Sequence, residues 1–145
     1  MKQFFTVIIF FATPFLGQVY AQNGHPGYLH ALSDLRAARW MINHRPGNWR
    51  TTADEDAAIR KIVDAIREIK KASIDDGKDI DDHAMADEIN DHAGRLQKAI
   101  EWLRRARADI SQYEDNVFAR GLRRRAFAHI DDAIRLTDKA RRSIR

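Results

Sequence analysis

Carboxylate and imidazole side chains in the middle of the chain have the types and spacing that best fit metal chemistry. The candidate ligands all lie between positions 79 and 92: Asp79, Asp81, Asp82, His83, Asp87 and His92. On a helix, His83 and Asp87 lie four residues apart, as do Glu88 and His92, so each pair projects from one face. Oxygen and imidazole ligands together suit Zn²⁺, Cu²⁺ or Ni²⁺. The alternative is a solvated acidic connection that binds no metal.

A second cluster is basic and has the chemistry of an anion site. Its members are arginines and one tryptophan: Trp49, Arg50, Arg120, Arg123, Arg124 and Arg125. Guanidinium groups beside an exposed aromatic ring can hold phosphate, sulfate or an acidic polysaccharide. The fold predicted below places the loop over residues 43–50 at the same end as residues 120–125, so we expect one surface. The alternative is that Trp49 covers the end of the bundle and the arginines are only solvated.

Other chemistry has little support in the sequence. Met41, Met85 and His129 are the plausible ligands for a noncovalent haem, although such residues usually fill a core or its boundary. The chain has no cysteine, which excludes thiolate zinc sites, iron–sulfur clusters, covalently attached haem and cysteine nucleophiles. It also has no serine nucleophile elbow and no glycine-rich phosphate loop. We therefore predict that the protein is not an enzyme.

The elements that must position these residues are helices, because one helical pattern occurs four times. Its leading alanines, at 31, 65, 99 and 133, are 34 positions apart each time. Each begins the pattern Ala-apolar-x-x-apolar-x-x-Ala, except that Thr137 replaces one apolar residue in the fourth copy. Spacings of three and four residues build one apolar stripe on a helix. Tetratricopeptide repeats share this period, but they need two helices per repeat, and here each period has one clear break.

One long helix and one short connection per period predict an all-α fold, an up-down-up-down antiparallel four-helix bundle. The predicted helices cover residues 27–44, 53–74, 84–112 and 117–143.

Capping residues support these helix starts. The predicted N-caps are Thr52, Asp81 or Asp82, and Asn116. Thr52 and Glu55 have the spacing of a capping box, in which each side chain accepts a backbone N–H of the other residue. Gly94 and Gly121 fall inside predicted helices, where we expect close contact with a neighbouring helix to explain them.

The first 21 residues have the composition of a cleaved signal peptide. Lys2 precedes an apolar run, and Val19-Tyr20-Ala21 is an acceptable cleavage site before Gln22. The alternative is a membrane anchor, but the run is shorter than the roughly 20 apolar residues of a spanning helix. We predict one domain over 22–145, periplasmic or secreted, with no membrane span after cleavage. An exported domain without disulfides must rely on its apolar core.

The segment His25-Pro26-Gly27-Tyr28-Leu29-His30-Ala31-Leu32, followed by Asp34-Leu35-Arg36, has the character of a family opening motif. The predicted architecture resembles uncharacterised exported bacterial four-helix-bundle proteins. It is also similar in layout to the small metal-binding protein family, periplasmic four-helix bundles with many histidines along repeated heptads. This chain has six histidines, none of which repeats in register. The resemblance therefore implies helix layout and localisation, and it implies no ligand residue.

These observations predict an exported binding or interaction module of the cell envelope. Its partner would be an envelope protein or an anionic polymer rather than nucleic acid, and it would be a monomer or a weak oligomer. The alternatives are a low-affinity divalent metal-binding or metal-buffering protein, and a noncovalent haem carrier.

Overall fold

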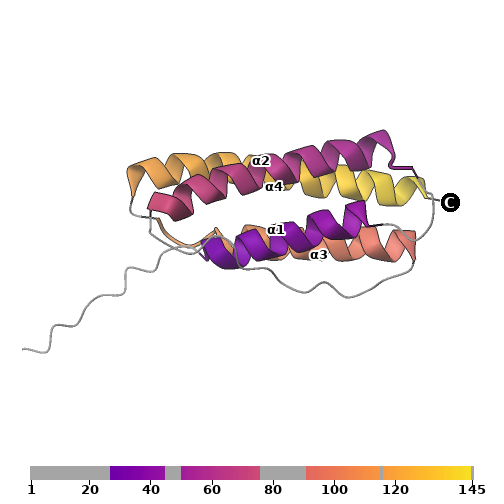
Figure 1. Cartoon of the computed structure of the whole chain (residues 1–145), viewed down its shortest axis with the longest axis horizontal. Helices are drawn as coiled ribbons and strands as arrows, with labels where there is room; N and C mark the ends of the chain where they lie inside the picture. Colours follow the sequence, from indigo (N-terminus) through magenta and orange to yellow (C-terminus); the bar gives the residue numbers. More distant parts are fainter. Residues whose placement is uncertain (1–26, 45–49, 76–90, 115, 145) are drawn as a thin grey trace, which may run out of the picture.

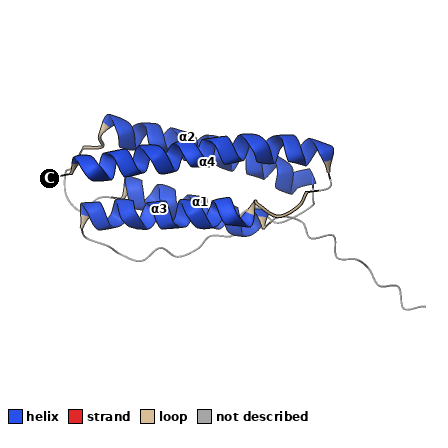
Figure 2. Cartoon of the chain, turned by 180° about the vertical axis from the view of Figure 1, so that it is seen from behind, coloured by secondary structure: helices blue, strands red, loops and turns tan. Residues whose placement is uncertain are grey.

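The computed structural model describes residues 27–44, 50–75, 91–114 and 116–144, and their secondary structure is helical (Figures 1 and 2). The four helices are α1 (Tyr28–Asn43), α2 (Ala53–Asp75), α3 (His92–Asp109) and α4 (Val117–Ser143). The described ranges contain no strand. The predicted all-α fold with four helices is confirmed, whereas the predicted signal peptide lies outside the described residues.

The 34-residue pattern forms the core of the bundle. All four leading alanines are fully buried, and so are the residues four positions later: Leu35, Ile69, Leu103 and Thr137. Thr137 is tolerated there because its hydroxyl donates a hydrogen bond of 2.7 Å to the carbonyl oxygen of Ala133, one turn earlier. The predicted register is therefore confirmed in every copy, and the polar exception satisfies its own hydrogen bond.

Two of the predicted helix caps are present. The Thr52 N–H donates to Glu55 Oε2 at 2.7 Å, and the Glu55 N–H donates to Thr52 Oγ1 at 3.2 Å, which completes the capping box of α2. At the start of α4, Asn116 Oδ1 accepts the N–H groups of Phe118 and Ala119. Both caps satisfy backbone donors that a helix start leaves free.

The third helix begins later than predicted. Asp91 has an extended backbone (φ −78°, ψ 129°), and its carboxylate accepts the N–H of Gly94 at 2.5 Å. Asp91 is therefore the N-cap, and α3 starts at His92 rather than at residue 84. The other predicted caps, Asp81 and Asp82, lie outside the described residues.

Neither helical glycine has the role expected of it. Gly94 belongs to the first turn of α3 and not to a helix interior. Gly121 lies inside α4, but a Cβ atom added there would meet only the Arg125 guanidinium, at 3.8 Å. No neighbouring helix approaches Gly121 closely, so the prediction of a close contact is wrong at this position.

The helices form two layers, α2 with α4 and α1 with α3 (Figure 1). Smaller contacts join α1 to α2 and α3 to α4. In the described part of the chain, the pairs α1–α4 and α2–α3 share no close backbone contact, so they lie on the diagonals. The order around the bundle is therefore α1, α2, α4, α3.

Contacts at the helix ends fix the directions. The N–H of Gly27, at the start of α1, donates to the carbonyl oxygen of Asp109, at the end of α3 (3.0 Å). Lys139 near the end of α4 pairs with Asp54 at the start of α2 (2.9 Å). Both main pairs are thus antiparallel, so α1 and α4 run one way and α2 and α3 the other (Figure 1).

The predicted up-down-up-down order is wrong, because that order would make α1 and α3 parallel. The late start of α3 explains the difference. The sixteen residues between Asp75 and His92 can span about 50 Å when extended, while α3 is about 27 Å long. The connection is therefore long enough to join opposite ends of the bundle.

Candidate functional site

Three large apolar side chains protrude at one end of the bundle. Tyr113 is 76% exposed, Val117 74% and Phe118 64%. They lie on the turn between α3 and α4 and on the first turn of α4, at the end where α1 begins (Figure 1). Large apolar groups that gather in water often mark an interaction surface.

Hydrogen bonds hold the turn that carries these side chains. Glu114 is 1% exposed, and its carboxylate accepts hydrogen bonds from the hydroxyl of Tyr28 and from the N–H of Asn116 (3.0 Å). The Arg123 guanidinium donates to the carbonyl oxygen of Gln112. Hydrogen bonds to α1 and α4 therefore fix the turn that carries the exposed side chains.

Two arginines of α4 stand beside the protruding apolar groups. Arg120 and Arg124 are exposed, and neither forms an ion pair with any described residue. They follow Val117 by three and seven positions, so the three share one face of α4. We call this surface the α4 tip: Tyr113, Val117, Phe118, Arg120 and Arg124.

The other predicted anion-binding residues have different positions or partners. Arg125 pairs with Glu68 of α2 at 3.0 Å. Glu68 lies about 20 Å along α2 from Glu55, which is in the first turn of the helix. Arg50 is exposed and lies just before this end of α2. The structure brings the arginines of α4 together but leaves Arg50 at the opposite end, because the connections α1–α2 and α3–α4 do not share an end. Trp49 lies outside the described residues.

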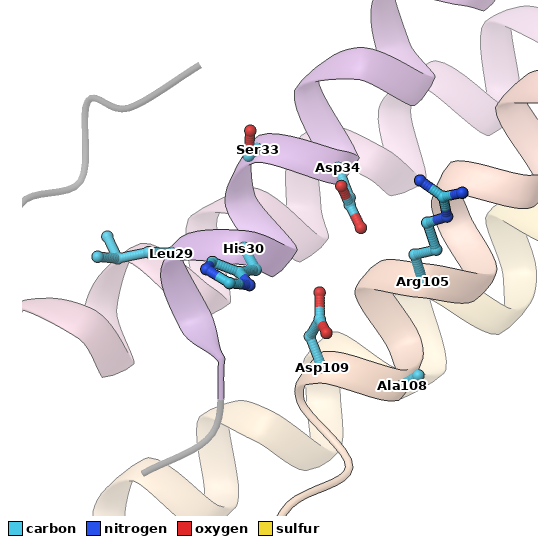
Figure 3. Close-up of a pocket in the computed structure, with 7 residues that line it drawn as sticks. All are labelled: Leu29, His30, Ser33, Asp34, Arg105, Ala108 and Asp109. Carbon is cyan, nitrogen blue, oxygen red and sulfur yellow. The ribbon is translucent and has the colours of Figure 1, made fainter. Parts of the chain in front are cut away.

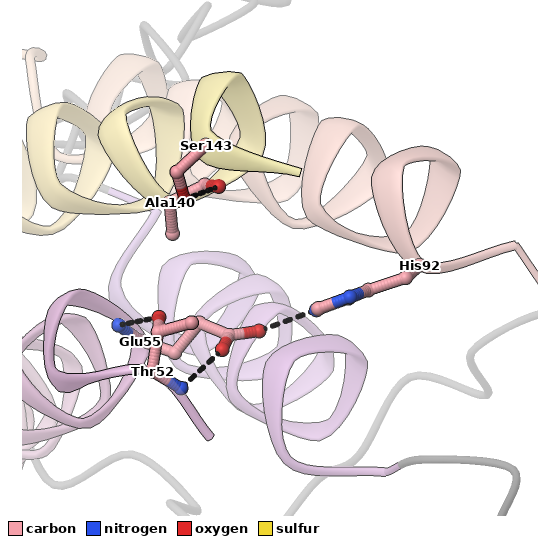
Figure 4. Close-up of polar contacts among 5 residues, drawn as sticks. All are labelled: Thr52, Glu55, His92, Ala140 and Ser143. Carbon is pink, nitrogen blue, oxygen red and sulfur yellow. Dashed lines mark hydrogen bonds and ion pairs between the residues drawn. The ribbon is translucent and has the colours of Figure 1, made fainter. Parts of the chain in front are cut away.

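His92 is the one predicted metal ligand that the structure describes. Its Nε2 lies 2.6 Å from Oε1 of Glu55, a fully buried carboxylate that also accepts the N–H of Thr52 (Figure 4). Burial raises the pKa of Glu55, but the Thr52 N–H and His92 together hold this pKa below its ordinary value. His92 thus joins the start of α3 to the start of α2.

Metal and haem binding remain predictions from the sequence. Asp79, Asp81, Asp82, His83 and Asp87 lie outside the described residues, as does Met85. Among the residues that are described, no three His, Asp or Glu side chains lie close enough to hold a metal ion. Met41 is fully buried in the core, and His129 is half-buried on α4.

The structure also contains a polar cavity between α1 and α3 that the sequence did not reveal (Figure 3). Its volume is about 370 Å³, and it is lined by Leu29, His30, Ser33, Asp34, Arg105, Ala108 and Asp109. The carboxylates of Asp34 and Asp109 point toward one another from facing helices, with Arg105 beside them.

This pair binds protons more strongly than ordinary carboxylates. Burial, and then the charge of Asp109, raise the pKa of Asp34 to about 6, against the opposing effect of Arg105 and His30. Burial also raises the pKa of Asp109. His30 and Asp34 lie four positions apart on α1, but Asp109 joins them only because α1 and α3 are antiparallel.

In the ranges that the structure describes, no helix is long and apolar enough to cross a membrane. Comparison with known proteins found no matching family model, no matching curated protein and no matching solved structure.

Proposed function

We propose that the protein is an exported, non-catalytic binding module that attaches to an anionic component of the cell envelope through the α4 tip. The observation that carries this proposal is that exposed arginines, which form no ion pair with a described residue, lie beside exposed aromatic and aliphatic groups on one surface. Other arginines of α4 are engaged within the chain: Arg123 holds the turn and Arg125 pairs with Glu68. Arg120 and Arg124 therefore keep their donors available for a partner.

The export part of the proposal rests on the first 21 residues. Their charged start, apolar run and Val19-Tyr20-Ala21 site have the order that signal peptidases cleave. A periplasmic or secreted protein meets acidic polymers and lipid headgroups of the envelope far more often than nucleic acid. This location makes the envelope the natural source of an anionic partner.

Titration with fluorescent dextran sulfate, a soluble anionic polymer, tests the proposal. Binding should be firm at about 20 mM salt and weak at about 0.3 M, because screening shortens the range of exposed charges. Arg120→Gln with Arg124→Gln should weaken binding about tenfold at low salt, through loss of two charge-assisted contacts.

The matched control removes two charges elsewhere, by Arg39→Gln with Arg60→Gln. Both residues are exposed, on α1 and α2, and neither pairs with a described residue. The control should bind as the unchanged protein does. Equal losses in the two double variants would mean that net charge alone attracts the polymer, and the α4 tip would be rejected as the site.

A further inference from the structure

We infer that the anionic partner of the α4 tip is the surface of a lipid bilayer, into which the apolar part of the tip inserts. This inference rests on the proposed function, since it uses the same surface, and it identifies the class of partner. The arginines alone suit many anions. The protruding apolar side chains discriminate among them.

The apolar groups suit a bilayer better than a polysaccharide. Val117 offers only methyl groups, which gain little from a hydroxylated and charged sugar chain, but which leave water when they pass below lipid headgroups. Phe118 and Tyr113 are aromatic, and aromatic rings favour the membrane interface. All three are exposed, on the turn before α4 and on its first turn at one end of the bundle, so they can enter a flat surface together.

The spacing along α4 places the arginines at a suitable depth. Arg120 follows Val117 by about 4.5 Å along the helix axis, and Arg124 follows it by about 10 Å. The apolar face of an interfacial helix is buried about 5–10 Å into the boundary between lipid headgroups and acyl chains. When Val117 and Phe118 are inserted to that depth with the start of α4 leading, Arg120 and Arg124 lie level with the lipid phosphates.

The described charges of the α4 tip favour an anionic surface, whereas Asp115, between Glu114 and Asn116, lies outside the described residues. Glu114 is buried, and Tyr28 and Asn116 donate to it. Glu68, farther along, pairs with Arg125. A second copy of the chain is a poorer partner, because two α4 tips in contact would bring four exposed arginines together.

Vesicle flotation with the full protein tests this inference, and dextran sulfate titration is run in parallel. The protein should float with vesicles of phosphatidylglycerol and phosphatidylcholine, and should not float with phosphatidylcholine alone. Val117→Ser with Phe118→Ser should lower vesicle affinity about tenfold or more, since both side chains lose apolar burial, while polymer binding stays unchanged. Arg120→Gln with Arg124→Gln should lower both, by about fivefold per arginine for vesicles.

Each remaining outcome overturns a specific part. Polymer binding without vesicle binding, or vesicle binding that survives Val117→Ser with Phe118→Ser, overturns the lipid inference and leaves the proposed function intact. If the unchanged protein binds neither dextran sulfate nor vesicles, the proposed function and the lipid inference are both overturned. Dimers that dissociate in the serine variant, with no flotation, would assign the tip to a second copy of the chain. Both replaced side chains are exposed, so helical circular dichroism should be the same in all variants.

Discussion

Replacing Asp34 by asparagine should stabilise the protein at neutral and alkaline pH. The pKa of Asp34 rises from 3.8 to about 6, chiefly through burial and then through the facing Asp109, while Arg105 and His30 oppose the rise. Each pKa unit corresponds to about 1.4 kcal/mol, which gives a ceiling of about 3 kcal/mol for a fully shielded group. Asp34 is only half-buried, and solvent screening reduces the expected gain to about 1–2 kcal/mol.

The size of the effect depends on pH. The folded state binds the proton more tightly than the unfolded state, so Asp34 is least costly below its unfolded pKa, near 4, where it is protonated in both states. Its cost grows as pH rises from about 4 to about 6, where the unfolded state has lost the proton and the folded state still holds it, and is complete above that value. Urea denaturation followed by circular dichroism at pH 4, 6 and 8 should show no gain from Asp34→Asn in acid and the full gain at pH 8.

Asp131→Asn is the matched control. Asp131 is exposed and pairs with Arg107 at 2.6 Å, so its replacement should cost between about 0 and 1 kcal/mol at pH 8. A destabilising effect of Asp34→Asn at pH 8, or a gain that does not change with pH, would refute the reasoning. The first result would mean that Arg105 holds Asp34 as a favourable anion, and the second would mean that the gain does not come from ionisation of Asp34.

Two further stability predictions follow from the helix starts and interiors. Gly121→Ala should raise the free energy of unfolding by about 0.5–1 kcal/mol, because the position is helical and has open space; an unchanged or lower urea midpoint would contradict this. Glu55→Gln should lower the free energy of unfolding by about 1–3 kcal/mol at pH 7, since the bonds from Thr52 and His92 lose their charged acceptor. The pKa of Glu55 is held below its ordinary 4.5, so this loss should shrink as pH falls below that value; a pH-independent loss in urea titrations would contradict it.

The sequence predicted the parts of the fold that depend on local spacing. The apolar stripe of each helix follows from intervals of three and four residues, and every leading alanine is buried as expected. The caps at Thr52 and Asn116 could also be predicted, because a cap needs only residues within one turn of each other. Asp91 was missed as a cap because the acidic residues before it, Asp81, Asp82, Asp87 and Glu88, offered equivalent candidates.

The order of the helices could not be predicted in the same way. Four nearly identical stripes pack equally well around a bundle in more than one order, since each order can make every neighbouring pair antiparallel. The candidate sites depend on that order: Asp34 meets Asp109 only when α1 and α3 are antiparallel. The α4 tip was predicted in part, through Arg120 and Arg124. Its Val117 and Phe118 are apolar like core residues, so the sequence did not show that they are exposed.

The packing of alternate helices also determines how the chain can come apart. The larger interfaces join the first half of the sequence to the second, α1 to α3 and α2 to α4. A hairpin of α1 and α2 alone would leave most of both apolar stripes in water, and so would α3 and α4 alone. Neither half should therefore fold by itself, and the protein should unfold in one cooperative transition. A chain cut between α2 and α3 should yield two fragments that hold together as a complex and lose their helicity when separated.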